Sequence, residues 1–455
     1  MSLYLYDLPT TGAISFSDFC TDGRADKLYS SHISEATQAR ADLRGVLKES
    51  KRAQDGEKDY LRLVKILDEY LPKLRGIMVC VANNEIGLKS EPIFSWRTTL
   101  SSHLFNASPR LSLPSLHADL AYSLLTYAFA LSNLARSKVL SLGLYEQDRA
   151  ISEVDRKAKD SQLTVAADLL CRASGIFSYI SNTVLLEWET ATPTSVFSKP
   201  PDLNREVTNA LAKSSLADAQ TLAIRKLLSK SAYDSNVAPG PPLPKSHPSP
   251  ALISKLHLEC SSLYSSARAL AKTPNSAGKG KGKGGPSADG EVSTDLRRYL
   301  NEETLFHDAL ARKWLGVDAG ENGGSERGGD AVGFLTWAKK ELEELKGRKK
   351  DRVSDELDNM SVFLKHYKKI NDSLHFQPVP TQSDLQARIP TGRLALTVKT
   401  YMPAQPAFGP GSVEHLRREA EELELDIEPS DSGASRSAGA YAGAGSYFLT
   451  AKVHL

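Results

Sequence analysis

Apolar residues recur at three- and four-residue intervals over most of this chain, which is the spacing of one face of an α-helix. The strongest example runs from about Ser115 to Leu144, where Leu116, Leu120 and Leu124 begin a continuous apolar stripe. The same spacing predicts further helices over residues 34–75, 161–188, 204–229 and 250–271.

Polar or proline-rich connections separate these predicted helices. The segment VAPGPPLPKSHPSP, from Val237, cannot be helical, because proline lacks an amide hydrogen and clashes with the preceding helical turn. Long helices joined in this way pack as antiparallel hairpins. The sequence therefore predicts a mainly α fold, an elongated, solenoid-like array of antiparallel helical hairpins.

Two stretches depart from the helical pattern near the chain ends. In the first 20 residues, Leu3 and Leu5 and then Ile14 and Phe16 alternate with other residues, which predicts a short extended hairpin and a small N-terminal β region. After Pro378 the chain is rich in proline, and apolar residues alternate over 394–398. We expect an extended conformation there.

Glycine-rich segments mark the expected domain organisation. Residues 273–290 and 317–330 are polar and rich in glycine, and we expect them to be flexible, exposed insertions within one domain of residues 1–410. Residues 411–455 are expected to form a short charged helix, over about 413–427, and a low-complexity tail.

Charge and cysteine content narrow the function classes. With 57 Lys and Arg against 55 Asp and Glu, the net charge of +2 does not indicate a nucleic-acid partner. The segment GKGKGKGG lacks the Ser or Thr that follows the lysine of a phosphate-binding loop. Four cysteines are far apart in the sequence, and Cys171 and Cys260 fall in apolar helical patterns. This usage is typical of a reducing compartment, so we expect a cytoplasmic location.

Targeting signals are equally sparse. The N-terminal segment has neither the basic region nor the apolar run of a secretory signal. We also expect no membrane span, because charged residues interrupt every apolar stretch. Membrane contact is therefore expected to be peripheral or indirect.

Residue patterns that carry catalysis are not found. The chain has no G-x-S-x-G or H-E-x-x-H motif, and its ten histidines are scattered. His375 lies in a distinctive segment, NDSLHFQPVP, but its simplest interpretation is a structural histidine near a turn. We expect no metal, no cofactor and no enzymatic activity. A hydrolase stays the least favoured alternative, which a strongly shifted pKa of Asp160 or His375 in a deep pocket would support.

The predicted helix over 250–271 carries apolar residues on more than one side. Leu252 and Leu256 are one turn apart, whereas Ile253 and Tyr264 can face elsewhere. Such a helix either lies between two layers or exposes a docking strip, and spacing alone favours the first interpretation.

Five segments resemble, in their order and spacing, the Bro-one domain, the boomerang-shaped helical domain of Alix-type ESCRT adaptors. They are LTVAADLLCRASGIFSYI from Leu163, SLADAQTLAIRKLL from Ser215, ALISKLHLECSSLY from Ala251, NDSLHFQPVP from Asn371 and IPTGRLALTVKTYMPAQPAFGP from Ile389. The resemblance covers nearly the whole chain. It departs at Ala223 and Ile224, where Alix has an aromatic pair.

The resemblance implies a partner and a site. In Bro-one domains, the positions that match Leu252 and Leu256 belong to a hydrophobic patch that receives the amphipathic C-terminal helix of the ESCRT-III Snf-seven subunit. An acidic residue of the same surface corresponds to Asp160. On this hypothesis Leu256 is exposed, and Leu256→Asp is expected to abolish binding while the fold stays intact.

Within the family, the chain looks most similar to a fungal member that acts in ambient-pH signalling. This implies a non-enzymatic adaptor that recruits ESCRT-III to the plasma membrane, with a pH-sensing receptor or arrestin complex as a further partner. A general endosomal sorting adaptor of the same fold is the alternative.

Overall fold

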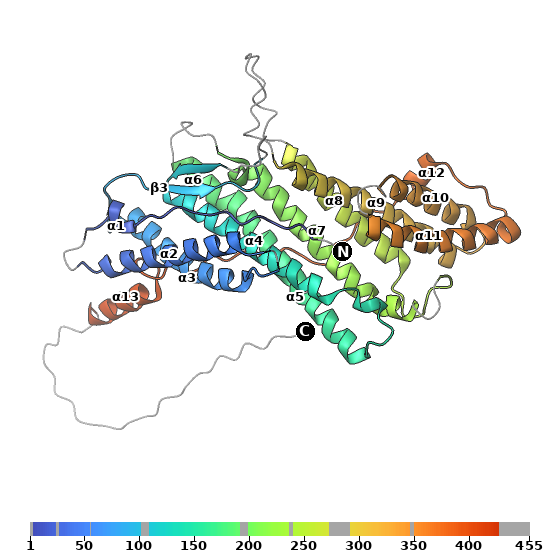
Figure 1. The fold of residues 1–455 in the computed structure, drawn as a ribbon, viewed down its shortest axis with the longest axis horizontal. Coiled ribbons are helices and arrows are strands. Elements are labelled where there is room, and N and C mark those ends of the chain that lie inside the picture. The colour runs from blue at the N-terminus through green and yellow to red at the C-terminus, as the bar shows by residue number, and fades with distance from the viewer. Residues whose placement is uncertain are drawn as a thin grey trace, which may run out of the picture.

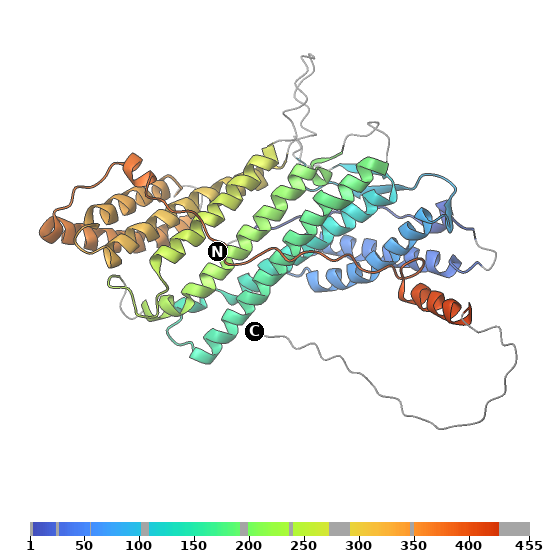
Figure 2. The ribbon, with the colours of Figure 1, turned by 180° about the vertical axis from the view of Figure 1, so that it is seen from behind.

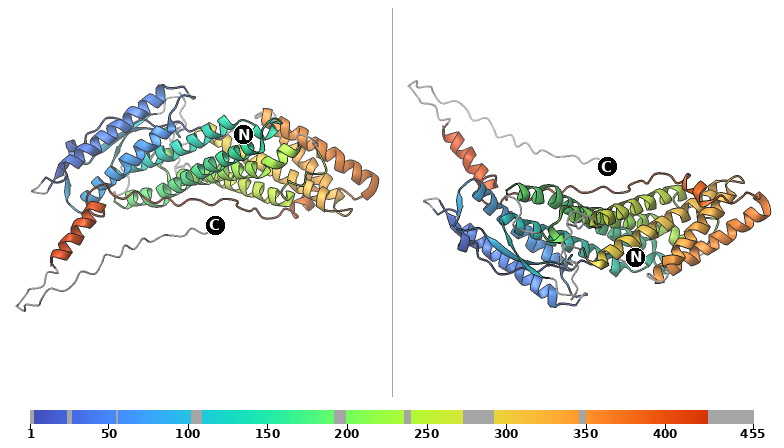
Figure 3. Two further views of the ribbon diagram at one scale, coloured as in Figure 1. Left: turned by 90° about the horizontal axis from the view of Figure 1, so that it is seen from below. Right: turned by 90° about the horizontal axis from the view of Figure 1, so that it is seen from above.

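A computed structural model describes residues 3–23, 27–54, 56–101, 109–191, 199–235, 240–272, 292–345 and 350–426. Long helices dominate it and pack against one another in chain order, from α2 against α3 to α10 against α11. Together they form an elongated, curved array (Figures 1 and 3), as the apolar spacing predicts. The principal helices are α2 (Ser30–Arg52), α3 (Tyr60–Ala82), α4 (Leu116–Leu142), α5 (Glu153–Tyr179), α7 (Arg205–Ser235), α8 (Pro250–Lys272), α9 (Thr294–Asn322), α10 (Gly328–Leu345) and α11 (Lys350–Ile370). Shorter helices are α1 (Phe16–Phe19), α6 (Leu185–Ala191), α12 (Gln382–Gln386) and α13 (Val413–Asp426).

Helix α4 is the centre of the first half of the array. It is buried almost all round between Leu116 and Ala135, because α3, α5 and the strands cover it on different sides. Ser115 caps its first turn by accepting a hydrogen bond from the His117 amide, and the helix ends at Gly143, whose φ of 59° favours glycine.

Helix α5 continues through a π-helical turn, Ile180–Val184, into α6. The combined run Glu153–Ala191 is, by length and composition, apolar enough to cross a membrane, although charged residues such as Asp168 and Arg172 interrupt it as predicted. However, 67% of its most apolar window is buried inside the helical array, as in the core helix of a globular domain.

The β structure consists, in the described ranges, of two antiparallel pairs. Strand β1 (Cys20–Asp22) pairs with β2 (Ile86–Leu88), and β3 (Ile93–Arg97) pairs with β4 (Arg110–Pro114). The predicted local hairpin in the first 20 residues is wrong. Residues 3–15 instead lie extended and form one bridge, Thr11 to Trp96, and residues Phe16–Phe19 form helix α1 just before β1.

A buried carboxylate ties the strands to the helices. Asp119, on α4, is fully buried and accepts hydrogen bonds from Arg40 of α2, at 3.1 and 2.9 Å, from Tyr70 Oη of α3, at 2.5 Å, and from Trp96 Nε1 of β3, at 2.7 Å. Four elements thus meet at one side chain, and the buried donors of Arg40, Tyr70 and Trp96 share the Asp119 carboxylate as their acceptor.

The two predicted insertions have different outcomes. Residues 273–290 lie outside the described residues. Residues 317–330 are not an exposed insertion: they include the end of α9 and the start of α10, and Val317 and Ala319 are fully buried. The glycines serve close packing there, since a Cβ at Gly320 would meet the ring of Tyr367 at 2.6 Å.

Candidate functional site

An extended segment, residues 392–408, crosses one face of the helical array (Figure 2) and is called the crossing segment below. It passes α8, where the Arg393 amide donates to the Lys255 carbonyl oxygen at 3.0 Å. It then passes α7, where the Gln220 side chain accepts hydrogen bonds from the Ala395 and Leu396 amides and donates one to the Leu396 carbonyl oxygen. Finally it passes α5, where the Lys399 amide donates to the Cys171 carbonyl oxygen.

Specific residues allow this close approach. A Cβ at Gly175 of α5 would collide with the Lys399 carbonyl oxygen, so only glycine permits the observed path. At the far end, the Phe408 ring lies against Gly76 and stacks on His32, with ring centroids 4.6 Å apart. The crossing segment is therefore an integral layer of the fold, and the extended conformation predicted around residues 394–398 is confirmed. Nearer to Pro378 the prediction is wrong, because Gln382–Gln386 forms helix α12.

The helix faces beside the crossing segment carry exposed apolar residues. Val165 lies one turn before Asp168, which pairs with Lys399, and Leu227 lies two turns after Gln220. Leu252 lies two turns before Glu259, against which Gly392 packs. These spacings place all three residues on the face that the crossing segment follows.

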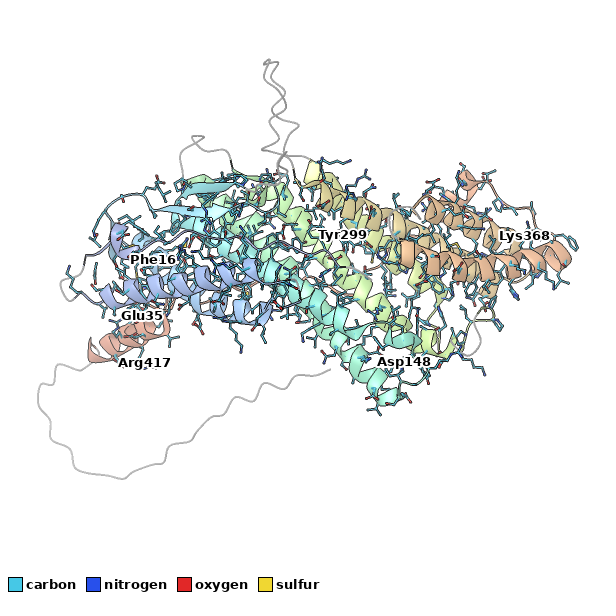
Figure 4. All side chains as sticks on the ribbon, viewed as in Figure 1. Phe16, Glu35, Asp148, Tyr299, Lys368 and Arg417 are labelled. Carbon is cyan, nitrogen blue, oxygen red and sulfur yellow. The ribbon has the colours of Figure 1, made fainter. Side chains whose placement is uncertain are left out.

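These residues also lie toward one end of the array. Helices α5 and α7 run antiparallel, as the Ser174–Ala212 and Thr164–Lys226 hydrogen bonds show, and α8 packs beside α7. The start of α5, the end of α7 and the start of α8 therefore come together, beside the loop that contains Asp148 in Figure 4. We call Val165, Leu227 and Leu252, together with the half-buried Ala223, the α5–α7–α8 surface.

Exposure differs between the two leucines that the sequence singled out. Leu252 is half-buried and packs against the main core at its edge, whereas Leu256 is only 4% exposed and belongs to that core. The expectation that Leu256 is an exposed docking residue is wrong, because α8 is covered by α7 on one side and by α9 on the other. Its contribution to partner binding stays a prediction, and any such contribution comes from supporting Leu252.

Asp160 lies at the contact between α5 and α7, where its side chain is 13% exposed. Its carboxylate accepts hydrogen bonds from Tyr145 Oη at 2.5 Å, and from Arg156 Nη1 and Ser229 Oγ at 2.9 Å each. Burial, followed by the hydrogen bond to Asp160, raises the pKa of Tyr145. The residue thus joins three elements, a structural role that its sequence position did not predict.

The α5–α7–α8 surface includes residues that the sequence analysis missed. Val165 and Leu227 are 47% and 41% exposed, yet in the sequence they look like ordinary members of apolar helical patterns. Their spacing from Asp168 and Gln220 becomes informative only when the path of the crossing segment is known.

A buried polar cluster lies between α7, α8 and α9. The Nδ1 atoms of His257 and His307 are 2.8 Å apart, and His307 Nε2 lies 3.3 Å from Thr221 Oγ1 and 3.8 Å from Glu303. All four side chains are buried. Since a substrate cannot reach them in this conformation, the cluster is a core network rather than an accessible catalytic site.

We expect the decrease in the free energy of unfolding at acidic pH to depend on His257. Burial, then the neighbouring His307, Lys313 and Arg352, lowers the pKa of His257 well below its ordinary value. The unfolded chain therefore binds a proton that the folded chain does not, so stability is present above about pH 6.5 and falls below it, by about 1.4 kcal/mol per pH unit. Urea unfolding at about pH 7.5 and about pH 5.5 measures this loss, and His257→Phe should reduce it. An equal pH dependence in both proteins would contradict the assignment.

The arrangement of the cysteines and acidic residues in the described ranges indicates neither a reactive thiol nor a metal site. All four cysteines are free and buried, and burial raises the pKa of Cys171 to about 11 and of Cys20 and Cys80 to about 12, so their thiols stay protonated near neutral pH. Within the described ranges, no three His, Cys, Asp or Glu side chains are grouped as metal ligands would be. Cys171 and Cys260 pack in the core, as their apolar context predicts.

Comparison with known proteins identifies the family. The model of the BRO1-like domain matches residues 21–410. The chain belongs to the BRO1-like domain family. The resemblance drawn from the five sequence segments is thus confirmed.

Similar curated proteins share the full length of this BRO1-family chain. The pH-response regulator protein palC of Cryptococcus neoformans is 35% identical over 98% of this chain and 100% of its own length. The palC proteins of Yarrowia lipolytica and Emericella nidulans are 24% and 23% identical, over 98% and 97% of this chain and 99% and 98% of their own.

Solved structures confirm the fold. An Alix structure in complex with an SIVmac239 late-domain peptide has a TM-score of 0.63 at 17% identity; it covers 94% of this chain, which spans only 54% of that Alix chain. A complex of the Alix BRO1 domain with CHMP4C has a TM-score of 0.59 at 18% identity, with 90% of this chain and 98% of the other covered. The family and the regulator relatives support an adaptor role.

Proposed function

We propose that this chain is a non-enzymatic adaptor that binds the amphipathic C-terminal helix of the ESCRT-III Snf-seven subunit. Leu252 is the contact residue, Leu256 supports it from the core, and Asp160 holds the end of the binding surface together. The observation that carries the proposal is the α5–α7–α8 surface, an apolar strip beside the crossing segment, in a fold whose Alix relative was solved with CHMP4C. The proposal specifies one helix and one face of the array.

The surface suits an amphipathic helix for physical reasons. Val165, Leu227 and Leu252 come from three rigid, packed helices, so little conformational entropy is lost when a partner covers them. The crossing segment borders the strip on one side. Leu256 lies in the core one turn beyond Leu252 and keeps the side of the strip formed by α8 in place. An incoming helix therefore meets a preformed apolar strip.

Asp160 contributes to the proposed site mainly by holding neighbouring elements in place. Its three hydrogen bonds hold α5, α7 and the Tyr145 turn together at the end of the strip. Its small exposed fraction leaves limited contact with a partner, and a solvated rim charge contributes less to affinity than a buried anchor. Its loss is expected to disturb the packing of this end.

The relatives support a proposal about the biological setting. Because the similar full-length proteins are pH-response regulators, we infer a role in fungal ambient-pH signalling, with recruitment from the cytoplasm to the plasma membrane. A pH-sensing receptor or arrestin complex would be the upstream partner. General endosomal sorting is the alternative role for the same binding surface.

Leu252→Asp tests the binding proposal directly. The variant is expected to weaken binding of the isolated Snf-seven C-terminal helix by about thirty-fold, equivalent to about 2 kcal/mol, because a charge replaces an interface anchor. Fluorescence anisotropy with the labelled helix measures the affinity, and circular dichroism monitors the fold. The matched control is Leu61→Asp, at an exposed leucine of α3 outside the strip.

The outcomes separate the site from the partner. If wild type does not bind the helix, the partner assignment is wrong. If Leu252→Asp binds as wild type does, the helix docks elsewhere. The variant can also be expressed in a fungal host that lacks its own palC-type regulator. If cells with Leu252→Asp do not grow at alkaline pH but sort endosomal cargo normally, the pH-signalling role is favoured over general sorting.

A further inference from the structure

A tightly held turn at one end of the molecule presents three apolar side chains to solvent. After α11, a π-helical turn spans Asn371–His375, and the chain then reverses toward α12. Leu374 is 71% exposed, Phe376 75% and Val379 52%. We call these three residues the apolar tip. Figure 4 places the neighbouring Lys368 at one extremity of the long axis.

The turn is built to hold this arrangement. Asn371 is almost fully buried; its side-chain amide donates to the Gln377 carbonyl oxygen at 2.9 Å, and its side-chain oxygen accepts from the Gln377 amide at 3.2 Å. The Phe376 amide donates to the Asn371 carbonyl oxygen at 2.7 Å. Gly328 and Gly329 of α10 let Asn371 and Pro378 approach their backbone closely. The apolar tip therefore projects from a rigid base.

Phe376 has an unusual backbone conformation. Its φ of 52° and ψ of 29° lie in the left-handed region, which glycine adopts at lower steric cost than an aromatic residue. The side chain is not held there by core packing, since three quarters of it is exposed. Folding alone would favour glycine at this position, so the aromatic ring points to a contact outside the chain.

The charge beside the apolar tip favours one kind of contact. Lys365, Lys368 and Lys369, which we call the lysine row, are exposed on the last turns of α11. Asp372 is the one acidic residue between Lys365 and Pro380, so this segment carries three positive charges against one negative charge. Apolar side chains flanked by lysines are typical of proteins that lie on anionic membranes, where long lysine stems reach the headgroups.

We propose that the apolar tip inserts into the interface of an anionic lipid bilayer while the lysine row contacts the lipid headgroups. The apolar tip follows Lys368, which lies at the end of the long axis in Figure 4, so a bilayer can receive it without contacting the α5–α7–α8 surface. This places the chain on the membrane directly, with its helix-binding strip free, and goes beyond the proposed function.

Vesicle co-sedimentation with the full chain tests the proposal. Wild type is expected to bind vesicles of phosphatidylcholine with phosphatidylserine and to bind phosphatidylcholine alone much more weakly. Phe376→Gly is expected to lower the partition coefficient by on the order of ten-fold while leaving the thermal melt unchanged or raised, because glycine fits the left-handed conformation. The double variant Lys368→Glu and Lys369→Glu should lower it by at least about twenty-five-fold. The control Leu140→Ser, at an exposed leucine of α4, should stay within about two-fold of wild type.

A second measurement addresses insertion itself. Tryptophan fluorescence of Phe376→Trp should be quenched by lipids brominated on their acyl chains. The proposal is overturned if wild type does not bind phosphatidylserine vesicles, or if Phe376→Gly binds them as tightly as wild type does. Absence of wild-type binding would favour a partner protein whose pocket receives the apolar tip. Leu252→Asp should bind vesicles as wild type does, and Phe376→Gly should bind the Snf-seven helix as wild type does, so each proposal can fail separately.

Discussion

Replacing Asp119 by alanine is expected to lower the free energy of unfolding by about 3–5 kcal/mol. The substitution removes the acceptor of four hydrogen bonds and leaves the buried Arg40 guanidinium without its counter-charge. It also leaves Tyr70 Oη and Trp96 Nε1 in a buried site without their acceptor, and unpaired buried donors are costly. Chemical denaturation followed by circular dichroism measures the loss.

The control for this prediction is Asp42→Ala on α2, where the carboxylate is exposed and only accepts a hydrogen bond from Gln38. That variant should change stability by about 0.5 kcal/mol or less. Because the Asp119 junction joins α2, α3, β3 and α4, we expect its loss to unfold the first half of the array before the second half. A change below about 1 kcal/mol in Asp119→Ala would show that the junction adds little beyond the packing around it.

Leu256→Asp is expected to unfold or aggregate the protein, at a cost of at least about 4 kcal/mol. Two terms act in the same direction: about 2–3 kcal/mol of hydrophobic burial is lost, and a carboxylate is placed among the apolar side chains of the core. Expression level, solubility and the thermal melt report the effect. Any loss of partner binding in this variant would follow from unfolding.

A milder substitution keeps the question of binding open to experiment. Leu256→Ala should cost about 2–5 kcal/mol of stability through the cavity that it leaves, and binding can then be measured on the folded fraction at low temperature. Leu252→Asp should melt close to wild type, since its side chain lies at the edge of the core. Equal melting of Leu256→Asp and wild type would contradict the buried position of Leu256.

The apolar spacing alone predicts most of the helical array. Around α4 and α5 the stripes of leucine and alanine leave few other solutions, because a helix with so much apolar surface must be covered on several sides. The order of the five resembling segments also predicts the family. These properties depend on local periodicity and chain order, which a sequence displays directly.

The packing of glycine-rich and extended segments cannot be predicted from the local sequence pattern. Residues 317–330 look like a flexible loop by composition, yet Gly320 and Gly328 allow close packing against Tyr367 and Asn371. The N-terminal residues alternate as a hairpin would, but their one bridge, from Thr11 to Trp96, reaches strand β3, 85 positions later in the chain. In both cases the partner is distant in sequence, and a local pattern carries no information about it.

The sequence by itself determined the helical periodicity, the proline-rich connections and the resemblance that led to Leu252, Leu256 and Asp160. Only the tertiary structure decided that Leu256 is core, that Asp160 is a joint between helices, and that Val165 and Leu227 share a face with Leu252. The physical reason is that exposure depends on which neighbour covers a residue. Here the crossing segment and helices α7 and α9 supply that cover, from positions that periodicity on α8 does not specify.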